Sequence, residues 1–173
     1  MKNLIVLLIG YSLFSCNQVK EAPPIDIGDP KYIDISRTIL SSLCEGDLEA
    51  FIDPYAENAR FRWNYGDSLV GRQAIFDYWK ERRNSVIDTI TFKNETWLSL
   101  KANQPPKHIK PGYYVLSWAD FTVSYTNGSS LKMNIHTVFR FNEKDQVEST
   151  LQYLDRSLIA DAIRPKVASS DSP

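Results

Sequence analysis

The first regular pattern along the chain is that of helices. Apolar side chains follow Pro30 at a spacing that places them on one helical face: Tyr32, Ile35, Ile39, Leu40 and Leu43. Gly46 ends this pattern because glycine commonly terminates helices, and Asp47 is then expected to cap a second, short helix. A third amphipathic helix is predicted over residues 72–84.

The pattern then changes to that of strands. Long stretches rich in β-branched and aromatic residues, separated by turn residues, occupy 88–100, 113–126, 131–141 and 146–155. A short strand is predicted earlier, over 59–63, and a closing helical turn over 156–163. Helices that precede an antiparallel meander indicate an α+β domain, with three N-terminal helices packed on one face of a curved, mostly antiparallel sheet.

Alternation within the strands predicts which side chains face the helices. In the strand 131–141 the odd positions are apolar except for Thr137, so they are expected to point inward. If the turn at 127–128 has an even length, these positions share the inner face with Trp118 and Asp120 of the preceding strand. Polar groups would then stand on an otherwise apolar concave face.

The first residues have the anatomy of an export signal. Lys2 precedes an apolar stretch over 4–14, which is shorter than the roughly 20 residues of a membrane-spanning helix. The stretch ends in Leu-Phe-Ser-Cys, which resembles the bacterial lipobox. We therefore expect a lipoprotein signal peptide over 1–15, acyl chains on Cys16, and a lipid-anchored location in the bacterial envelope, on the periplasmic side or at the outer membrane. An ordinary leader that is cut elsewhere, with Cys16 incidental, is the alternative.

The rest of the chain divides into a tether, one domain and a tail. Residues 16–30 are polar and contain prolines, which is typical of a tether; the domain is predicted over 31–163 and a flexible tail over 164–173. A length of 173 residues has room for one core. The formal net charge of −1 provides no basic field for binding nucleic acid. If Cys16 is acylated, Cys44 has no partner for a disulfide.

Short motifs carry a family resemblance. They are EGDLEAF at 45–51, YAENA at 55–59, GRQAI at 71–75, FTVSY at 121–125 and VFRFN at 138–142. Together they resemble the nuclear transport factor 2-like superfamily, in its polyketide-cyclase-like (SnoaL-like) and steroid-isomerase-like branch, over about residues 31–158. The resemblance implies a cystatin-like cone with an apolar interior. It also implies a homodimer formed through the convex face of the sheet, where His136 and Arg140 are expected.

The isomerase machinery of that superfamily is missing from this sequence. Steroid isomerases of this fold hold an enolate with a tyrosine and a protonated aspartate, and move a proton with a second aspartate. Laid on their motifs, the tyrosine falls at Ile39, the oxyanion aspartate at Thr137 and the base at Trp63. Because none of these side chains can do that chemistry, steroid isomerase activity by the known mechanism is not expected.

Binding of a small, largely apolar molecule, without a cofactor, is the first functional hypothesis. The side chains expected to line the cone are Trp63, Trp79, Trp118, Thr137, Tyr153 and Asp155. A second hypothesis is an enzyme, because the polyketide-cyclase-like branch keeps an aspartate near the end of the final strand as a general base, and Asp155 resembles that position.

In the enzyme hypothesis the protein is a cofactor-free cyclase, isomerase or dehydratase, with Tyr153 or Asp120 assisting Asp155. An aromatic pocket would raise the pKa of the Asp155 carboxyl and make it a useful base. The alternatives are that Asp155 caps the turn at 156–158 or pairs with Arg156, and that Asp120 faces water. A third hypothesis makes the convex face a partner or homodimer surface.

Other chemistry has little support in the sequence. Its two histidines, His108 and His136, have no second ligand at metal-binding spacing, so no metal site is predicted. Motifs of serine hydrolases, P-loops and dinucleotide-binding folds are absent from the sequence. The charge run at 80–83 is predicted to be a solvated helix face, suited to a helix C-terminus.

Overall fold

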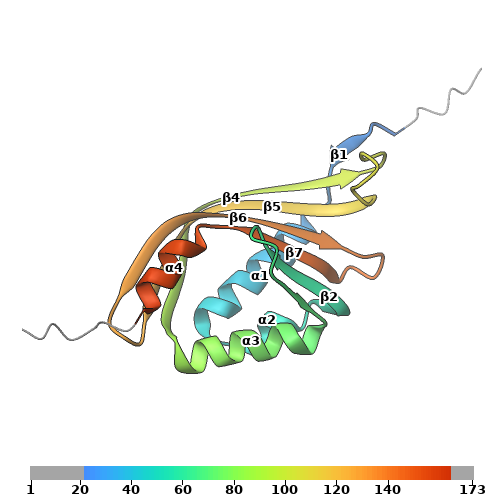
Figure 1. Ribbon diagram of the computed structural model, residues 1–173. Coiled ribbons are helices and arrows are strands. Elements are labelled where there is room, and N and C mark those ends of the chain that lie inside the picture. Colours follow the sequence, from blue (N-terminus) through green and yellow to red (C-terminus); the bar gives the residue numbers. More distant parts are fainter. Residues whose placement is uncertain (1–21, 165–173) are drawn as a thin grey trace, which may run out of the picture.

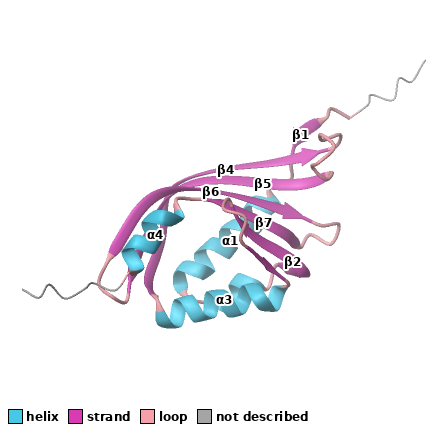
Figure 2. Cartoon of the chain, viewed as in Figure 1, coloured by secondary structure: helices cyan, strands magenta, loops and turns pink. Residues whose placement is uncertain are grey.

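A long, curved sheet wraps around helices that lie in its concavity (Figures 1 and 2). The computed structural model describes residues 22–164. Its helices are α1 (Lys31–Glu45), α2 (Leu48–Ile52), α3 (Arg72–Ser85) and α4 (Arg156–Ile163). Its strands are β1 (Ile25–Ile27), β2 (Tyr55–Trp63), β3 (Ser68–Val70), β4 (Ile87–Ala102), β5 (Gly112–Tyr125), β6 (Ser130–Phe141) and β7 (Val147–Tyr153).

The sheet has the strand order β1-β4-β5-β6-β7-β2-β3. Neighbouring strands are antiparallel except β2 and β7, which are parallel. This arrangement confirms the predicted α+β class with three helices before the meander. Within the described residues, no helix has the length and apolarity needed to cross a membrane.

The helix boundaries follow the signals in the sequence. Gly46 ends α1 in the left-handed region with φ 81°, and its N–H donates to the carbonyl of Ser42. The Asp47 side chain then accepts from the Ala50 N–H at 3.0 Å and caps α2. Ile39 of α1 is fully buried, so the predicted apolar face does pack on the sheet.

Part of the predicted tether belongs to the domain. β1 lies within 16–30 and pairs with the end of β4, with Ile25 opposite Ala102. Gly28 follows so closely that an added Cβ would lie 2.3 Å from the Ser99 Oγ, so only glycine fits there. The predicted signal peptide, Cys16 and the tail after residue 164 lie outside the described residues.

The turn between β5 and β6 sets which residues share the inner face. The Tyr125 N–H donates to the Ser129 carbonyl at 2.9 Å, which leaves a loop of residues 126–128 rather than an even-length turn. Gly128 adopts φ 78°, as the last residue of such a loop requires. An odd loop pairs residues of the same parity, so Thr137 lies opposite Ser117.

The prediction for the faces is therefore right for β6 and wrong for β5. Ile135, Thr137 and Phe139 are buried on the concave side, as expected. Trp118 lies opposite His136 and so belongs to the convex face, where Asp120 also lies. The error comes from the assumed loop length, from which the inner face of β5 was inferred.

Candidate functional site

A small cavity lies inside the cone, between the inner face of the sheet, α3 and α4. Its volume is about 70 Å³. Its lining is mostly apolar and aromatic: Leu43, Trp63, Tyr78, Trp79, Arg82, Ile87, Phe92, Phe121, Val123, Tyr125, Ile135, Gln152, Leu154, Arg156 and Ile159. The lining contains no aspartate, glutamate or histidine, and its titratable side chains are those of Tyr78, Tyr125, Arg82 and Arg156.

Aromatic rings form one wall of this cavity. The ring of Tyr78 lies 5.2 Å from that of Trp63 and 5.4 Å from that of Trp79, centroid to centroid. Trp63 and Trp79 are both buried and both line the cavity, so the prediction places these two correctly. The rings stiffen the wall and supply a large apolar contact area.

Two arginines stand over the same rings. The Arg82 guanidinium lies 5.2 Å from the Tyr78 centroid, and that of Arg156 lies 5.4 Å from the Trp63 centroid. Arg156 forms an ion pair with Asp67. Among the described residues, no aspartate or glutamate forms an ion pair with Arg82. The cavity therefore carries positive charge that its own lining does not neutralise.

Two polar atoms of the predicted set are buried without a partner. The indole Nε1 of Trp79 has no hydrogen-bond partner among the described residues, although the side chain is only 9% exposed. The hydroxyl of Thr137 is in the same situation. Thr137 lies on the inner face as predicted, but it is not among the residues that line the cavity. Buried donors without partners are rare in native proteins and mark places where a ligand or water can bind.

Asp155 does not point into the cavity. Its carboxylate caps α4 by accepting from the Ser157 N–H at 3.0 Å and the Ser157 hydroxyl at 2.5 Å. These hydrogen bonds lower the pKa of the Asp155 carboxyl, whereas the enzyme hypothesis needed it raised. Its neighbours Leu154 and Arg156 line the cavity, and Asp155 itself is exposed between them. The capping alternative is the correct one.

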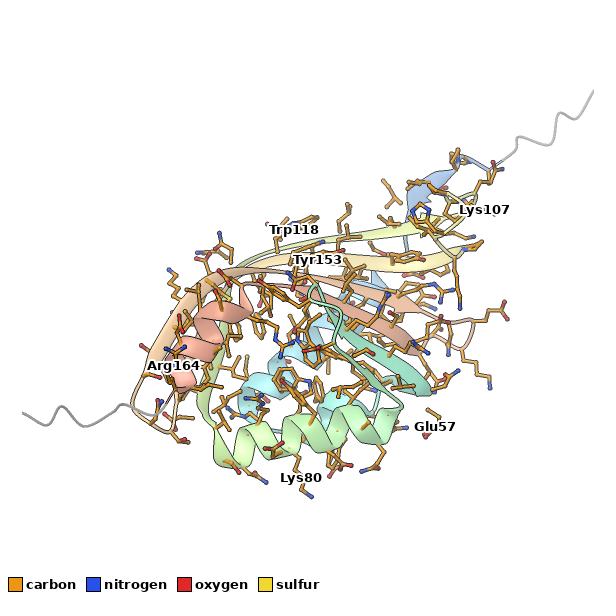
Figure 3. All side chains as sticks on the ribbon, viewed as in Figure 1. Glu57, Lys80, Lys107, Trp118, Tyr153 and Arg164 are labelled. Carbon is orange, nitrogen blue, oxygen red and sulfur yellow. The ribbon has the colours of Figure 1, made fainter. Side chains whose placement is uncertain are left out.

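Tyr153 and Trp118 lie on the convex face rather than in the cone. Trp118 stacks on His136 with centroids 4.7 Å apart, and His136 stacks on Tyr153 at 5.6 Å. Trp118 is 42% exposed and Tyr153 is 45% exposed. Figure 3 shows Trp118 on the side of the sheet away from the helices. The cone prediction was wrong for both residues, because the strand register turns them outward.

Asp120 also faces outward. It accepts from the Asn94 side-chain amide at 2.9 Å and lies 3.8 Å from the Lys132 ammonium. The residues proposed to act together in catalysis, Asp155, Tyr153 and Asp120, therefore do not converge on the cavity. Among the described residues, no group of three or more histidine, cysteine, aspartate or glutamate side chains is arranged to hold a metal ion.

Sequence reasoning missed Gln152, Tyr78 and Arg82 as cavity residues. Gln152 pairs with Thr137 across β6 and β7, so its inward direction depends on strand register. Tyr78 and Arg82 share a helical face with each other, four residues apart on α3, and this spacing was a usable signal. This spacing was overlooked because the charge run at 80–83, which includes Arg82, was interpreted as a solvated face.

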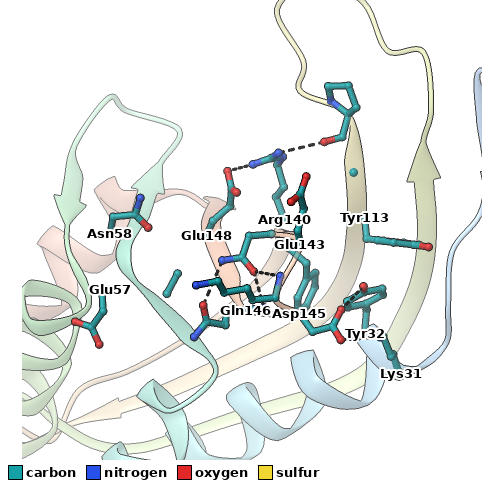
Figure 4. Close-up of a pocket in the computed structure, with 16 residues that line it drawn as sticks. Lys31, Tyr32, Glu57, Asn58, Tyr113, Arg140, Glu143, Asp145, Gln146 and Glu148 are labelled. Atoms are coloured by element: carbon teal, nitrogen blue, oxygen red, sulfur yellow. Dashed lines mark hydrogen bonds and ion pairs between the residues drawn. The ribbon is translucent and has the colours of Figure 1, made fainter.

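A larger, open groove lies elsewhere, along the first turn of α1 and the β6–β7 turn (Figure 4). Its volume is about 970 Å³. There the Asp145 carboxylate accepts from the Lys31 ammonium at 2.8 Å and the Tyr32 hydroxyl at 2.6 Å, while Arg140 pairs with Glu148. The hydrogen bond from Lys31, followed by that from Tyr32, lowers the pKa of the Asp145 carboxyl.

The fold and its cavity define an open cone of the nuclear transport factor 2-like class. A model of the SnoaL-like domain matches residues 37–149, and the chain therefore belongs to the SnoaL-like family. No curated protein matches the chain.

Solved structures agree with this fold. A candidate polyketide cyclase from Xanthomonas campestris pv. campestris aligns with TM-score 0.61 and 12% identity, over 78% of this chain and 97% of that one. An NTF2-like protein of unknown function from Burkholderia pseudomallei K96243 aligns with TM-score 0.60 and 14% identity, over 78% of this chain and 98% of that one. An LEH-like epoxide hydrolase from M. tuberculosis aligns with TM-score 0.57 and 9% identity, over 77% of this chain and 89% of that one. At such identities the likeness concerns the fold alone.

Proposed function

We propose that this domain binds a small, largely apolar molecule in its cone. The observation that carries the proposal is the composition of the cavity, whose wall is aromatic and whose lining lacks carboxylate and imidazole. Such a lining suits an apolar ligand held by contact area, with a few polar groups fixing its orientation. Acid–base turnover would need a proton acceptor that this lining does not supply.

The cavity limits the size of the ligand. Its volume of about 70 Å³ is well below the roughly 300 Å³ at the lower end of ordinary ligand sites. A short chain or a single ring is the scale that fits, with modest movement of the wall. That movement is easiest at α4, because this helix has no fully buried residue.

Hydrogen bonds fasten α4 to the loop between β5 and β6, and its side chains Ile159, Ala162 and Ile163 are only partly buried against the core. At its C-terminal end the Ala162 carbonyl accepts from the Asn127 amide at 2.9 Å and the Ser129 hydroxyl at 2.7 Å. Two α4 residues, Arg156 and Ile159, line the cavity. We therefore propose that the ligand enters on the α4 side.

The proposal can be tested with 1-hexanol as a neutral probe and ¹⁵N NMR of the tryptophan indoles. We expect saturable shifts at Trp63 and Trp79, while the exposed Trp118 stays unchanged and serves as an internal reference. Ile159→Trp should fill the cavity and abolish the shifts. Leu158→Trp, on the exposed side of the same helix, is the matched control. Shifts that survive in Ile159→Trp would contradict the proposal.

A second experiment tests the hypothesis of an enzyme with Asp155 as its base, against which the capping role of Asp155 speaks. A compound that co-purifies with the protein, identified by mass spectrometry, would be incubated with the protein and with Asp155→Asn. Asparagine also caps helices, so the fold is preserved. We expect the affinity for the compound and the rate of any turnover to be the same in both proteins. Turnover that is lost while binding is retained would establish the alternative.

We also propose that the domain is anchored to a membrane of the bacterial envelope through acyl chains on Cys16. The support is the apolar stretch that ends in Leu-Phe-Ser-Cys. Labelling with radioactive palmitate should yield a labelled protein, and Cys16→Ser should remove the label and release the protein from membranes. Cys44→Ser is the matched control, and unchanged membrane association of Cys16→Ser would contradict the anchor.

The second candidate function is the formation of a homodimer through the convex face of the sheet. Its support is the exposed stack of Trp118 and Tyr153 on either side of His136. Large exposed aromatic side chains that stand together mark interaction surfaces. Sedimentation should show a dimer that Trp118→Glu dissociates. Tyr65→Glu, at an exposed aromatic residue away from the stack, is the control. A monomer without any substitution would refute this interface.

A further inference from the structure

Resting on the binding function proposed above, we infer that the ligand of the cone is an apolar carboxylic acid in its anionic form. Its hydrocarbon part would lie against the aromatic wall. Its carboxylate would lie at the guanidinium of Arg82, within the same cavity. The inference adds the charge and the chemical class of the ligand to a site otherwise defined only as apolar.

Two cations stand at the aromatic wall of the cavity. Tyr78 and Trp63 lie side by side, and each ring carries one guanidinium, Arg82 over Tyr78 and Arg156 over Trp63. All four side chains line the cavity. Both arginines are half-buried, so their charge acts in surroundings that screen it less than bulk water does.

The charges of the two arginines are balanced differently. Asp67 compensates Arg156, and the side chains of this pair are 35% and 63% exposed. Arg82 has no carboxylate partner among the described residues, and none of the other lining residues is acidic. A half-buried guanidinium has five N–H donors and favours a carboxylate, which can accept two of them at once.

The indole N–H of Trp79 is an independent, buried donor at the same cavity. The Trp79 Nε1 has no partner among the described residues, and the side chain both lines the cavity and is nine-tenths buried. An unpaired N–H in such a place is satisfied by an acceptor on the ligand. Carboxylate oxygens are acceptors only, so they match both Trp79 and Arg82.

The test compares two ligands of the same shape, hexanoate and hexanamide, with 1-hexanol as the neutral reference. The protein is the full chain carrying Cys16→Ser, so that no acyl chain is attached. Binding is followed through the indole N–H signals of Trp63 and Trp79, each assigned with a Trp→Phe variant. We expect hexanoate to bind at least about tenfold more tightly than hexanamide, since one charge-assisted hydrogen bond has that effect.

Arg82→Gln should remove the preference for the acid, so that hexanoate binds no more tightly than hexanamide. Arg37→Gln is the matched control, because Arg37 also lies over an aromatic ring, that of Trp97 at 5.6 Å, but lines a different hollow. If Arg82→Gln fails to fold, the comparison of acid and amide on the unsubstituted Arg82 still decides the charge preference.

Each outcome has one meaning. Equal affinities for hexanoate and hexanamide overturn the inference and leave the proposed binding function standing. Absence of cone shifts with all three probes overturns both. A preference for hexanoate that persists in Arg82→Gln overturns the assignment of the carboxylate to Arg82.

Discussion

The open groove and the cone cavity differ in whether their charged groups already have partners. The open groove is by far the larger, at about 970 Å³ against about 70 Å³ for the cone cavity. In the groove, Lys31 pairs with Asp145 and Arg140 with Glu148. In the cone, Arg82 and the Trp79 N–H have no such partner among the described residues. The smaller hollow is therefore the better candidate for a ligand.

The groove also shows what its charges do instead. Asp145 belongs to the β6–β7 turn, and its bonds to Lys31 and Tyr32 fasten that turn to the start of α1. Arg140 leaves its Nε without a partner, but Glu148 compensates its charge and the Pro111 carbonyl accepts from another nitrogen. These contacts hold elements together, and size alone is a poor guide to function.

The largest expected effect is on the aromatic wall of the cone. Trp79→Ala should lower the free energy of unfolding by about 3–5 kcal/mol, because it removes a buried side chain that packs against Phe51 and Phe61. Urea denaturation measures the change. Trp118→Ala on the convex face is the control and should cost about 1 kcal/mol or less, since Trp118 is partly exposed. Similar losses in both variants would contradict the division between the two faces.

The next effect separates paired from unpaired arginines. Glu148→Gln should lower the free energy of unfolding by about 1–2 kcal/mol, because it leaves the mostly buried Arg140 guanidinium without its counter-charge. Arg82→Gln should change stability by about 0.5 kcal/mol or less, since no ion pair is lost. Thermal and urea unfolding of the two variants provide the comparison. A larger loss for Arg82→Gln would mean that Arg82 has a structural role.

A smaller effect concerns the pH dependence of the groove. The folded state lowers the pKa of Asp145, so its stabilising contribution is present above the unfolded pKa of about 3.9 and is lost as the pH falls through the folded value. Lys31 has a raised pKa, so its contribution is lost only at strongly alkaline pH. The melting temperature of Asp145→Asn should therefore lie below that of the wild type near pH 7 and converge with it in acid. Parallel curves down to acid pH would refute this linkage.

The smallest effect is expected at the cap of α4. Asp155→Ala should lower the melting temperature slightly through loss of the bonds to Ser157, and Asp155→Asn should retain most of it. Neither variant should alter binding of hexanoate, because the carboxylate is exposed outside the cavity. A tenfold loss of binding in Asp155→Asn would show that the carboxylate does reach the ligand.

The sequence by itself determined most of the helices and strands, the inward faces of α1 and β6, and the family. Helical spacing predicted the buried face of α1, alternation predicted the inner face of β6, and short motifs predicted the cone. These features depend on local periodicity and on the preferences of individual residues, both of which can be read from one chain. Helical spacing placed Trp79 in the cone, and the family resemblance placed Trp63 there.

The tertiary structure alone decided which residues meet in the cavity. Trp118 turned outward because the loop at 126–128 has an odd length, and one residue more or less moves a whole strand to its other face. Asp155 became a helix cap because α4 begins directly after it. Arg82, assigned to solvent from its charged neighbours, reaches the cone because α3 packs at its open side. These outcomes depend on register and packing between distant segments, which local pattern does not determine.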